Sequence, residues 1–306
     1  MNLLLEQFEN EAIDRIVRFS KIADKMHFGI CLGFSGGKDS QVCYHLCKRA
    51  GIKFKAYYNH CFESGATRMF IRENYPDVIY RRVIKEGFVR NIQVNHRGIL
   101  PTVQIAYCCA DYKHNRKFVD DCSITGVRRA ESFSRRNRTA LSVRNKTVLR
   151  KNETLFDDYF ETNCQSVGDA SVIALKPIID WSDDDVWEYI KKYNIPINPE
   201  YKSNRRIGCI VCPKANFNTN YASLIKYPKL IDAFITAKEK GAPNCDWIIT
   251  SSSENCIEDK CYYICRWLNH SFMPFTKRQE NLYKLVKDAY EKNKTKTITQ
   301  KFGVLK

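Results

Sequence analysis

The chain has 306 residues with 44% hydrophobic residues and a formal net charge of +16, a length ample for a hydrophobic core, so its 14 cysteines are not needed as disulfide staples. The first residues form an acid-bearing amphipathic pattern, and no apolar run approaches membrane-spanning length, which excludes a signal peptide and a transmembrane segment from our expectations. We therefore expect a cytoplasmic protein with no membrane partner, whose cysteines are buried apolar residues, metal ligands or reactive thiols.

Apolar runs alternate with amphipathic stretches over the first two thirds of the chain. The spacing predicts helices at residues 6–26, 38–50, 66–74 and 107–121, and strands at residues 28–34, 53–59, 78–83 and 122–127. Strands that alternate with helices predict right-handed crossovers, so the expected fold class is α/β with a doubly wound, mostly parallel sheet. After about residue 215 helical patterns dominate. We expect two domains, residues 1–215 with the sheet and a helical, basic C-terminal extension over residues 216–306.

Positive charge is concentrated in two segments of the chain. Residues 128–151 hold nine arginines and lysines against one acid, Glu131, and residues 277–306 form a second, lysine-rich segment. Such segments suit polyanions, and DNA is the partner that we expect them to contact. The alternative for both segments is a basic, well-solvated surface.

The segment SGGKDS, residues 35–40, follows the first predicted strand and opens a helix. In a doubly wound sheet this is a ligand-binding position at the carboxyl end of a strand. Gly36 and Gly37 permit close backbone approach, the successive N–H groups and the helix N-terminus favour an anion, and Lys38 adds a positive charge. The glycine spacing differs from that of a Walker A motif. The segment therefore predicts a phosphate-binding loop of another kind.

Several blocks in the chain together resemble one known family. SGGKDS matches the pyrophosphate-binding loop of the ATP pyrophosphatase superfamily, and SITGVRRAESFSRR, DWSDDDVWEYIKKYNIP and IGCIVCP follow in the order of the phosphoadenylylsulfate reductase family. The resemblance covers about residues 28–215 and implies an adenine nucleotide alpha hydrolase-like fold. It implies these nucleotide-binding residues: Ser35, Gly36, Gly37, Lys38, Asp39, Ser40, Gly126, Arg128 and Arg129. Taken by itself, the DWSDDDVW block predicts a helix with Ser182 at its N-cap.

Two cysteine pairs lie within the same blocks. Cys108-Cys109 and Cys209-x-x-Cys212 are similar to the arrangement in the cluster-bearing adenylylsulfate reductases, and that resemblance implies a [4Fe–4S] cluster held by four thiolates. Zinc is the alternative metal. Adjacent cysteines are awkward for either site, because neighbouring side chains on an α-helix diverge by about 100°. The Cys-x-x-Cys pair alone would also fit a redox dithiol.

The loop is intact here, whereas the reductases typically carry a degraded version of it. An intact loop implies that the chain binds ATP itself with Mg²⁺, splits it between the α and β phosphates and releases pyrophosphate, with Lys38 and Asp39 as catalytic residues. The reductases end in a Glu-Cys-Gly-(Leu/Ile)-His segment whose cysteine attacks sulfur. The nearest match is Glu254-Asn255-Cys256, without the glycine or the histidine, so Cys256 is a weaker catalytic candidate.

An intact loop, a cysteine cluster and a basic surface together resemble the sulfur-transfer ATPases of DNA phosphorothioation systems, which work beside a cysteine desulfurase. The resemblance implies adenylation of an acceptor, so that sulfur can replace an oxygen. Within enzymes the alternatives are an adenylylsulfate or phosphoadenylylsulfate reductase and a sulfate adenylyltransferase-like activity. Outside them, a non-catalytic regulator that binds nucleotide and DNA and senses redox state remains open. Pyrophosphate release would separate the enzymes that split ATP from the regulator.

Overall fold

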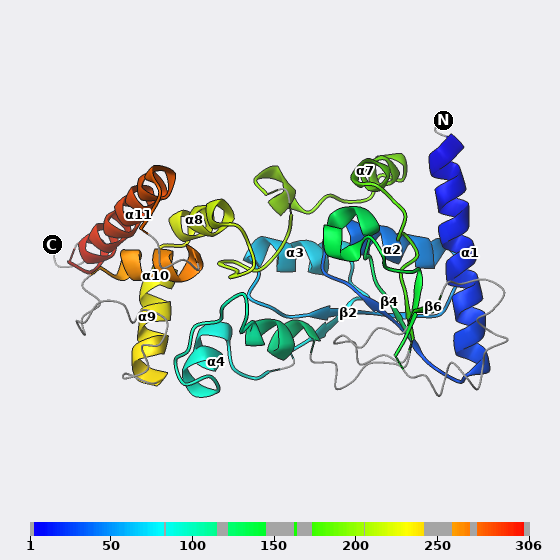
Figure 1. The fold of residues 1–306 in the computed structure, drawn as a ribbon, viewed down its shortest axis with the longest axis horizontal. Helices are drawn as coiled ribbons and strands as arrows, with labels where there is room; N and C mark the ends of the chain where they lie inside the picture. Colours follow the sequence, from blue (N-terminus) through cyan, green and yellow to red (C-terminus); the bar gives the residue numbers. More distant parts are fainter. Residues whose placement is uncertain are drawn as a thin grey trace. The chain divides into compact units, whose positions relative to one another are not determined.

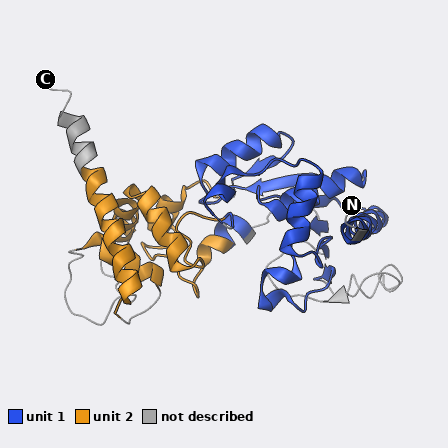
Figure 2. Ribbon diagram, turned by 90° about the horizontal axis from the view of Figure 1, so that it is seen from above, with its two compact units in different colours: residues 1–83, 110–207 blue, residues 84–109, 208–306 orange. Residues whose placement is uncertain are grey.

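The computed structural model describes residues 3–82, 84–114, 122–144, 162–163, 173–204, 206–241, 259–269 and 274–302. The chain divides into two compact units, shown in different colours in Figure 2: residues 1–83 with 110–207, and residues 84–109 with 208–306. This division differs from the expected boundary at residue 215. The segment 84–109 belongs to the second unit because its helix α4 (Phe88–Val94) packs against α9 (Lys229–Gly241).

The first unit contains a seven-stranded sheet in the order β3-β2-β1-β4-β7-β5-β6 (Figure 1). The strands are β1 (Ile30–Gly33), β2 (Lys55–Asn59), β3 (Ile79–Arg81), β4 (Cys122–Ile124), β5 (Leu141–Val143), β6 (Thr162–Asn163) and β7 (Ile173–Leu175). Every described pair is parallel except β5 with β7. Leu32 on β1 aligns with Ala56 on β2 and with Ile124 on β4. The α/β class and the mostly parallel sheet are confirmed.

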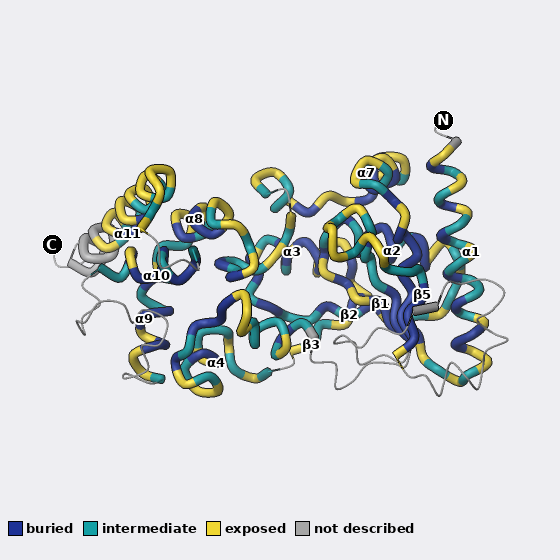
Figure 3. Tube along the Cα trace, viewed as in Figure 1, coloured by how far each residue is buried: buried dark blue, intermediate teal, exposed yellow. Residues whose placement is uncertain are grey.

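Helices cover the sheet and complete the core of the first unit. They are α1 (Leu3–Lys25), α2 (Lys38–Arg49), α3 (Gly65–Asn74) and α7 (Asp183–Lys192), with three short 3-10 turns at Arg129–Glu131, Phe133–Arg135 and Pro199–Lys202. Figure 3 shows the buried trace at the central strands. The strands β4, β5 and β7 are buried throughout and β1 is buried except at Gly33, whereas β2 alternates between buried and more exposed residues and β3 is the edge strand. Ser182 caps α7 as predicted, since its hydroxyl accepts from the Asp185 N–H at 3.1 Å and Asp185 accepts from the Ser182 N–H at 2.7 Å.

The second unit is helical in its described part. Besides α4 and α9 it contains α8 (Phe217–Lys226), α10 (Lys260–Asn269) and α11 (Lys277–Phe302). Aromatic packing holds it together: Phe234 contacts the rings of Phe88 and Trp267, and the Trp267 indole N–H donates to the Pro101 carbonyl at 2.8 Å. The predicted helical C-terminal region is thus present. No described helix is long and apolar enough to cross a membrane.

Candidate functional site

Residues 35–40 lie where β1 ends and α2 begins, as the sequence predicts. Gly36 has φ +71°, a left-handed conformation that a side chain would strain, and a Cβ there would lie 2.9 Å from the Ile71 side chain. Its carbonyl accepts hydrogen bonds from the amides of Gln41 at 3.0 Å and Asn198 at 3.1 Å. The loop therefore requires glycine at this position and is fixed from both sides.

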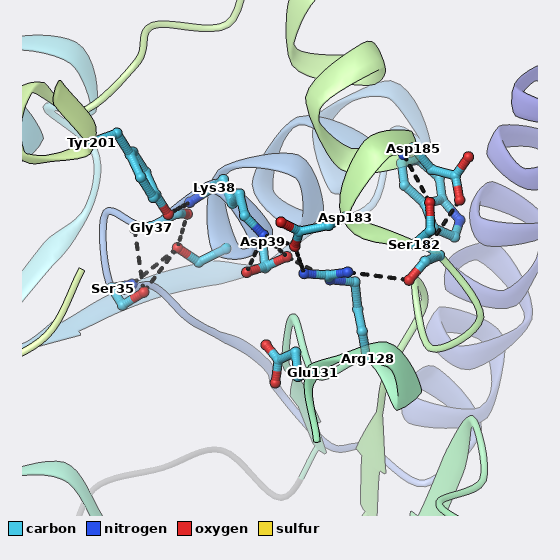
Figure 4. Close-up of polar contacts among 12 residues, drawn as sticks. Ser35, Gly37, Lys38, Asp39, Arg128, Glu131, Ser182, Asp183, Asp185 and Tyr201 are labelled. Atoms are coloured by element: carbon cyan, nitrogen blue, oxygen red, sulfur yellow. Dashed lines mark hydrogen bonds and ion pairs between the residues drawn. The ribbon is translucent and has the colours of Figure 1, made fainter. Parts of the chain in front are cut away.

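Several donors of the loop, the N–H groups of Gly37 and Lys38 and the Ser40 hydroxyl, bond within the protein (Figure 4). The Gly37 N–H donates to Ser35 Oγ at 3.3 Å, and the Lys38 N–H donates to the Tyr201 hydroxyl at 2.9 Å. Ser40 Oγ donates to the Gly37 carbonyl at 2.8 Å and lies 3.2 Å from Ser35 Oγ. Burial raises the pKa of Tyr201 to about 12, so its hydroxyl stays protonated. These N–H groups and hydroxyls can be exchanged for contacts with phosphate oxygens.

Two cations and two carboxylates meet beside the loop. Arg128, only 2% exposed, donates to Asp39 Oδ1 at 2.6 Å, to Asp183 Oδ1 at 2.7 Å and to the Trp181 carbonyl at 3.2 Å. Lys38 Nζ donates to the same Asp183 oxygen at 2.7 Å and lies 3.4 Å from Asp39 Oδ1. Burial would raise the pKa of Asp183, but the hydrogen bonds from Lys38 and Arg128 hold it below its usual value. Asp183 is therefore a carboxylate at neutral pH.

Gly126 and Arg129, the other predicted nucleotide-binding residues, are placed differently. A Cβ on Gly126 would lie 2.8 Å from the Asp39 carbonyl carbon and oxygen, so glycine permits close packing of β4's exit against the loop. Arg129 does not point to the loop: its guanidinium pairs with Asp180 and donates to the Arg138 carbonyl. The structure thus brings Gly126 and Arg128 to the loop, whereas the Arg129 guanidinium bonds Asp180 and the Arg138 carbonyl.

A group of arginines follows Arg128 along the chain. Burial and the neighbouring charges of Arg138 and Arg206 lower the pKa of Arg135, which pairs with Glu131. Arg128 adds to this positive potential. Like charges gathered in this way favour an anion, and we call Arg135, Arg138 and Arg206 the arginine group.

Parts of three predictions lie outside the described residues. Cys256 falls there, as do residues 145–151 of the first basic segment and residues 303–306 of the second. The described part of the second segment is α11, a helix of the second unit.

The four predicted metal ligands all belong to the second unit. A hydrogen bond with Cys109, burial, and the charges of Cys109, Cys209 and Cys212 all raise the pKa of Cys108, so the two pairs interact. Cys109 is the first residue of a π-helical turn (Cys109–His114), and Cys108 directly precedes that turn. Val211, between the other two cysteines, has φ +53°, a strained value for a β-branched residue. Even so, no three His, Cys, Asp or Glu side chains of the described chain form a ready metal site.

The sequence interpretation missed three residues of the loop's surroundings. No role at the loop was predicted for Asp183, Asn198 or Tyr201. Asn198 is fully buried and bonds the Gly36 carbonyl, and Tyr201 bonds the Lys38 N–H. A Ser-Asp-Asp-Asp run with more acids than a cap requires was the one available signal for Asp183.

Comparison with known proteins gives a family match and several distant relatives. The family model of the phosphoadenosine phosphosulfate reductase domain matches residues 29–215. An uncharacterized protein of Methanocaldococcus jannaschii is 25% identical over 240 residues, which cover 76% of this chain and 53% of that protein. Sulfate adenylyltransferase subunit 2 of Rhizobium tropici is 28% identical over 207 residues, covering 64% and 67%. The same subunit of Rhizobium sp. is 31% identical over 190 residues, covering 56% and 60%. The chain therefore spans about half to two thirds of the length of these relatives.

Two solved structures are also similar, each with a TM-score of 0.44. One is phosphoadenylyl-sulfate reductase from Candida auris in a phosphate complex, 12% identical, covering 68% of this chain and 95% of that chain. The other is Candida glabrata FMN adenylyltransferase with FAD and inorganic pyrophosphate, 14% identical, covering 87% of this chain and 86% of that chain.

Proposed function

The chain belongs to the phosphoadenosine phosphosulfate reductase domain family, and on that premise we propose that it binds ATP at residues 35–40, splits it between the α and β phosphates and adenylates an acceptor for sulfur transfer. The observation that carries the proposal is the intact loop SGGKDS with Lys38 and Arg128 gathered beside it. A chain that only received an activated nucleotide would not need a complete pyrophosphate loop.

ATP binding would exchange contacts that the loop now makes with itself. The N–H groups of Gly37 and Lys38 would turn from Ser35 and Tyr201 to phosphate oxygens, at the positive end of α2. Lys38 would turn from Asp183 to the β and γ phosphates. Because its side chain is only 7% exposed, its charge is weakly screened and acts strongly on a bound phosphate.

Asp39 and Asp183 are the residues that would hold Mg²⁺. Their Oδ1 atoms bond the same two cations, Lys38 and Arg128, so they converge on one small region, and oxygen donors are what this ion prefers. When bound, Mg²⁺ would offset the charge of the phosphates. Asp39 and Asp183 would then exchange part of their pairing with Arg128 for the metal.

The reaction is an in-line displacement at the α-phosphorus. An acceptor oxygen forms a bond to that phosphorus, the bond to the α–β bridging oxygen breaks, and pyrophosphate leaves with the bond's electron pair. Lys38 and the loop N–H groups would stabilise the charge that develops on the leaving pyrophosphate. Arg128 would hold Asp39 in place and supply charge beside the α-phosphate.

The four cysteines Cys108, Cys109, Cys209 and Cys212 would hold a [4Fe–4S] cluster. Support comes from their residue type, from the interaction of Cys108 with the other three and from the strained backbone at Val211. Without a metal, gathering four thiols disfavours their thiolate forms, as the raised pKa of Cys108 reflects. When bound, the cluster would supply electron transfer or a place to hold sulfur. Zinc is the alternative occupant of the same ligands.

For the acceptor we propose a DNA phosphate oxygen, with a cysteine desulfurase as the source of sulfur. Support comes from the net charge of +16 and from the arginine group, which lies in the same unit as the loop and can contact phosphates without reading sequence. Adenylation would make the acceptor oxygen a good leaving group: a persulfide sulfur supplied by the desulfurase would form a bond to the DNA phosphorus, and AMP would leave with that oxygen. A thiol reductant would then cleave the S–S bond and leave the phosphorothioate.

A second candidate acceptor is sulfate. Two relatives, each a sulfate adenylyltransferase subunit 2, favour it. That activity shares the loop chemistry proposed above and differs only in the acceptor, but it assigns no role to the four cysteines.

The test is pyrophosphate release by anaerobically purified protein with ATP and Mg²⁺, with duplex DNA or sulfate as acceptor. We expect release that depends on an acceptor and is lost in the Lys38→Ala, Asp39→Ala double variant while the fold is kept. Stimulation by sulfate alone would replace DNA by sulfate as the acceptor. Sulfite formed from a preformed adenylylsulfate, with no release from ATP, would identify a reductase instead. Nucleotide binding without turnover under any condition would favour the non-catalytic regulator over the enzymes.

A further inference from the structure

A cationic cavity lies beside α3, built from residues that take no part in the nucleotide loop. Its volume is about 330 Å³, and its lining comprises His60, Gly65, Arg68, Met69, Arg72 and Tyr80. Within the described part of the chain no carboxylate belongs to this lining. Arg68 and Arg72 come from α3, and Tyr80 from the edge strand β3.

The positive groups of this cavity repel one another. Arg68 and Arg72 are four residues apart on α3, a spacing at which like charges destabilise a helix. Arg68 Nη1 donates to His60 Nε2 at 2.8 Å, so the imidazole is an acceptor there and carries its proton on Nδ1. Burial and the charges of Arg68, Arg82 and Arg72 lower the pKa of His60 and keep this ring neutral. A bound anion would relieve the repulsion.

One acid does interact with the cavity from its buried side. Glu63 faces Arg68, but burial raises the pKa of Glu63, and the Tyr58 hydroxyl donates to its carboxyl at 2.6 Å. Glu63 is not part of the lining. Arg72 is exposed and stacks over the Tyr80 ring at 5.4 Å from its centroid, which orients the guanidinium without cancelling its charge.

The same helix separates the cavity from the nucleotide loop. Thr67 and Ile71 turn toward the loop: Asn198 contacts both Thr67 and the Gly36 carbonyl, and a Cβ on Gly36 would touch Ile71. Arg68 and Arg72 are the next positions along the chain, about 100° further around the helix. The two sites share α3 as a wall but no side chain.

We propose that this cavity is a second anion site and that it takes the phosphate group of a small phosphorylated molecule. Two guanidinium forks match a tetrahedral oxyanion, and the neutral His60 keeps one N–H donor. The Tyr80 ring and Met69, which is 61% exposed, offer apolar surface to the organic part of such a ligand. A cavity of about 330 Å³ is in the range of small-molecule sites.

The test uses inorganic phosphate as the probe and the full chain with Lys38→Ala, which disables the nucleotide loop, so that failure of the proposed ATP site does not affect the result. Titration calorimetry should detect phosphate binding, and Arg72→Gln should weaken it by about tenfold or more, the usual effect of one charge-assisted contact. Lys21→Ala on α1 is the control for loss of one exposed positive charge and should change nothing. Because Arg72 is exposed, Arg72→Gln should keep the fold, which circular dichroism checks.

A second readout does not depend on variants. Phosphate should move the His60 imidazole resonance toward the protonated form at constant pH, because the anion offsets the nearby guanidinium charges. Equal phosphate affinity in Arg72→Gln and Lys21→Ala, or an unmoved His60 resonance at saturating phosphate, would overturn the site. A single-stranded oligonucleotide that binds through Arg72 more tightly than phosphate would overturn the assignment to a small phosphorylated molecule.

Discussion

At the residue scale, Arg128 and Lys38 are held by the carboxylates that a bound metal would need. Both cations bond Asp183 at 2.7 Å, and Arg128 bonds Asp39 at 2.6 Å. The charges of Lys38 and Arg128 are thus balanced by those of Asp39 and Asp183. ATP alone would bring its negative phosphates against these two carboxylates, so we expect ATP to bind together with Mg²⁺. This pairing could not be predicted from the sequence, because residues 39, 128 and 183 become neighbours only when α2, β4 and α7 meet at one end of the sheet.

Arg128→Lys should weaken ATP binding by roughly tenfold, because lysine keeps the charge but cannot bridge Asp39, Asp183 and the Trp181 carbonyl at once. The measurement is the dissociation constant of a non-hydrolysable ATP analogue with Mg²⁺. Arg129→Lys is the matched comparison, since Arg129 pairs with Asp180 instead, and its loss should be clearly smaller. Equal losses in the two variants would contradict the role given to Arg128.

Gly126→Ala should abolish nucleotide binding and lower stability. The new Cβ would lie 2.8 Å from the Asp39 backbone, and backbone at the start of α2 cannot move without displacing the loop. Gly33→Ala serves as the control at the end of β1, because its Cβ would meet only the Ile124 carbonyl oxygen at 3.9 Å. The test compares ATP-analogue affinity and melting temperature in both proteins, and normal affinity in Gly126→Ala would show that the loop tolerates the shift.

At the element scale, the first three helices and the strands β1 to β4 were predicted, including the three-residue strands β3 within 78–83 and β4 within 122–127, whereas β5, β6 and β7 were not. The helices predicted at 6–26, 38–50 and 66–74 correspond to α1, α2 and α3, and the strands predicted at 28–34 and 53–59 contain β1 and β2. The strands β5, β6 and β7 have only two or three residues each, too few to show a period, and their partners are far away in sequence. Within the helix predicted at 107–121, the structure describes the π-helical turn Cys109–His114. The spacing of apolar residues does not predict this kind of turn.

The helices α1, α2 and α7 are joined at one buried carboxylate, Glu9. It is 2% exposed and accepts from Arg49 at 3.0 Å, Lys192 at 2.8 Å and Tyr193 at 2.7 Å. Burial acts to raise the pKa of Glu9, but the three hydrogen bonds outweigh it and hold the pKa below its usual value. A lowered pKa in the folded state means that this stabilisation is full above the unfolded pKa and is lost as the pH falls through the folded one.

Glu9→Gln should therefore lower the free energy of unfolding by roughly 2 kcal/mol at pH 7, the usual contribution of hydrogen bonds to a charged group. The difference from the parent should shrink below about pH 4, where Glu9 in the unfolded chain is protonated. Urea unfolding of both proteins at pH 7, and at the lowest pH where both fold, measures this difference in the free energy of unfolding. A difference that does not change with pH would mean that Glu9 acts through packing alone.

At the scale of the whole molecule, the chain builds its second unit from two separate segments. Residues 84–109 join residues 208–306, so both cysteine pairs fall in one unit although about a hundred residues separate them. Sequence reasoning identified the pairs but assigned them to the sheet domain, because the crossing of α4 onto α9 leaves no periodic signal. The helical C-terminal region, by contrast, follows from the helical patterns that dominate the sequence after about residue 215.

Removing the metal should destabilise the second unit, because the proposed cluster would tie the turn at Cys109 to the loop around Val211. Protein purified without oxygen should be brown and contain about four iron and four labile sulfide per chain. Replacing any one of Cys108, Cys109, Cys209 or Cys212 by serine should bleach the protein and lower its melting temperature. Cys61→Ser is the control: its thiol donates to the Asn59 carbonyl at 3.2 Å, a bond that a hydroxyl can keep, so colour and iron should be unchanged.

The metal content decides among three outcomes. Stoichiometric zinc without sulfide would keep the four ligands and replace the cluster by a structural site. Absence of any metal, together with melting temperatures of the four serine variants equal to that of Cys61→Ser, would exclude both the iron–sulfur cluster and the zinc site. The raised pKa of Cys108 makes a further distinction possible. A metal would hold its sulfur as thiolate, so Cys108 in metal-free protein should react with iodoacetamide more slowly than an ordinary thiol at pH 8, and restoring iron and sulfide should block the reaction completely.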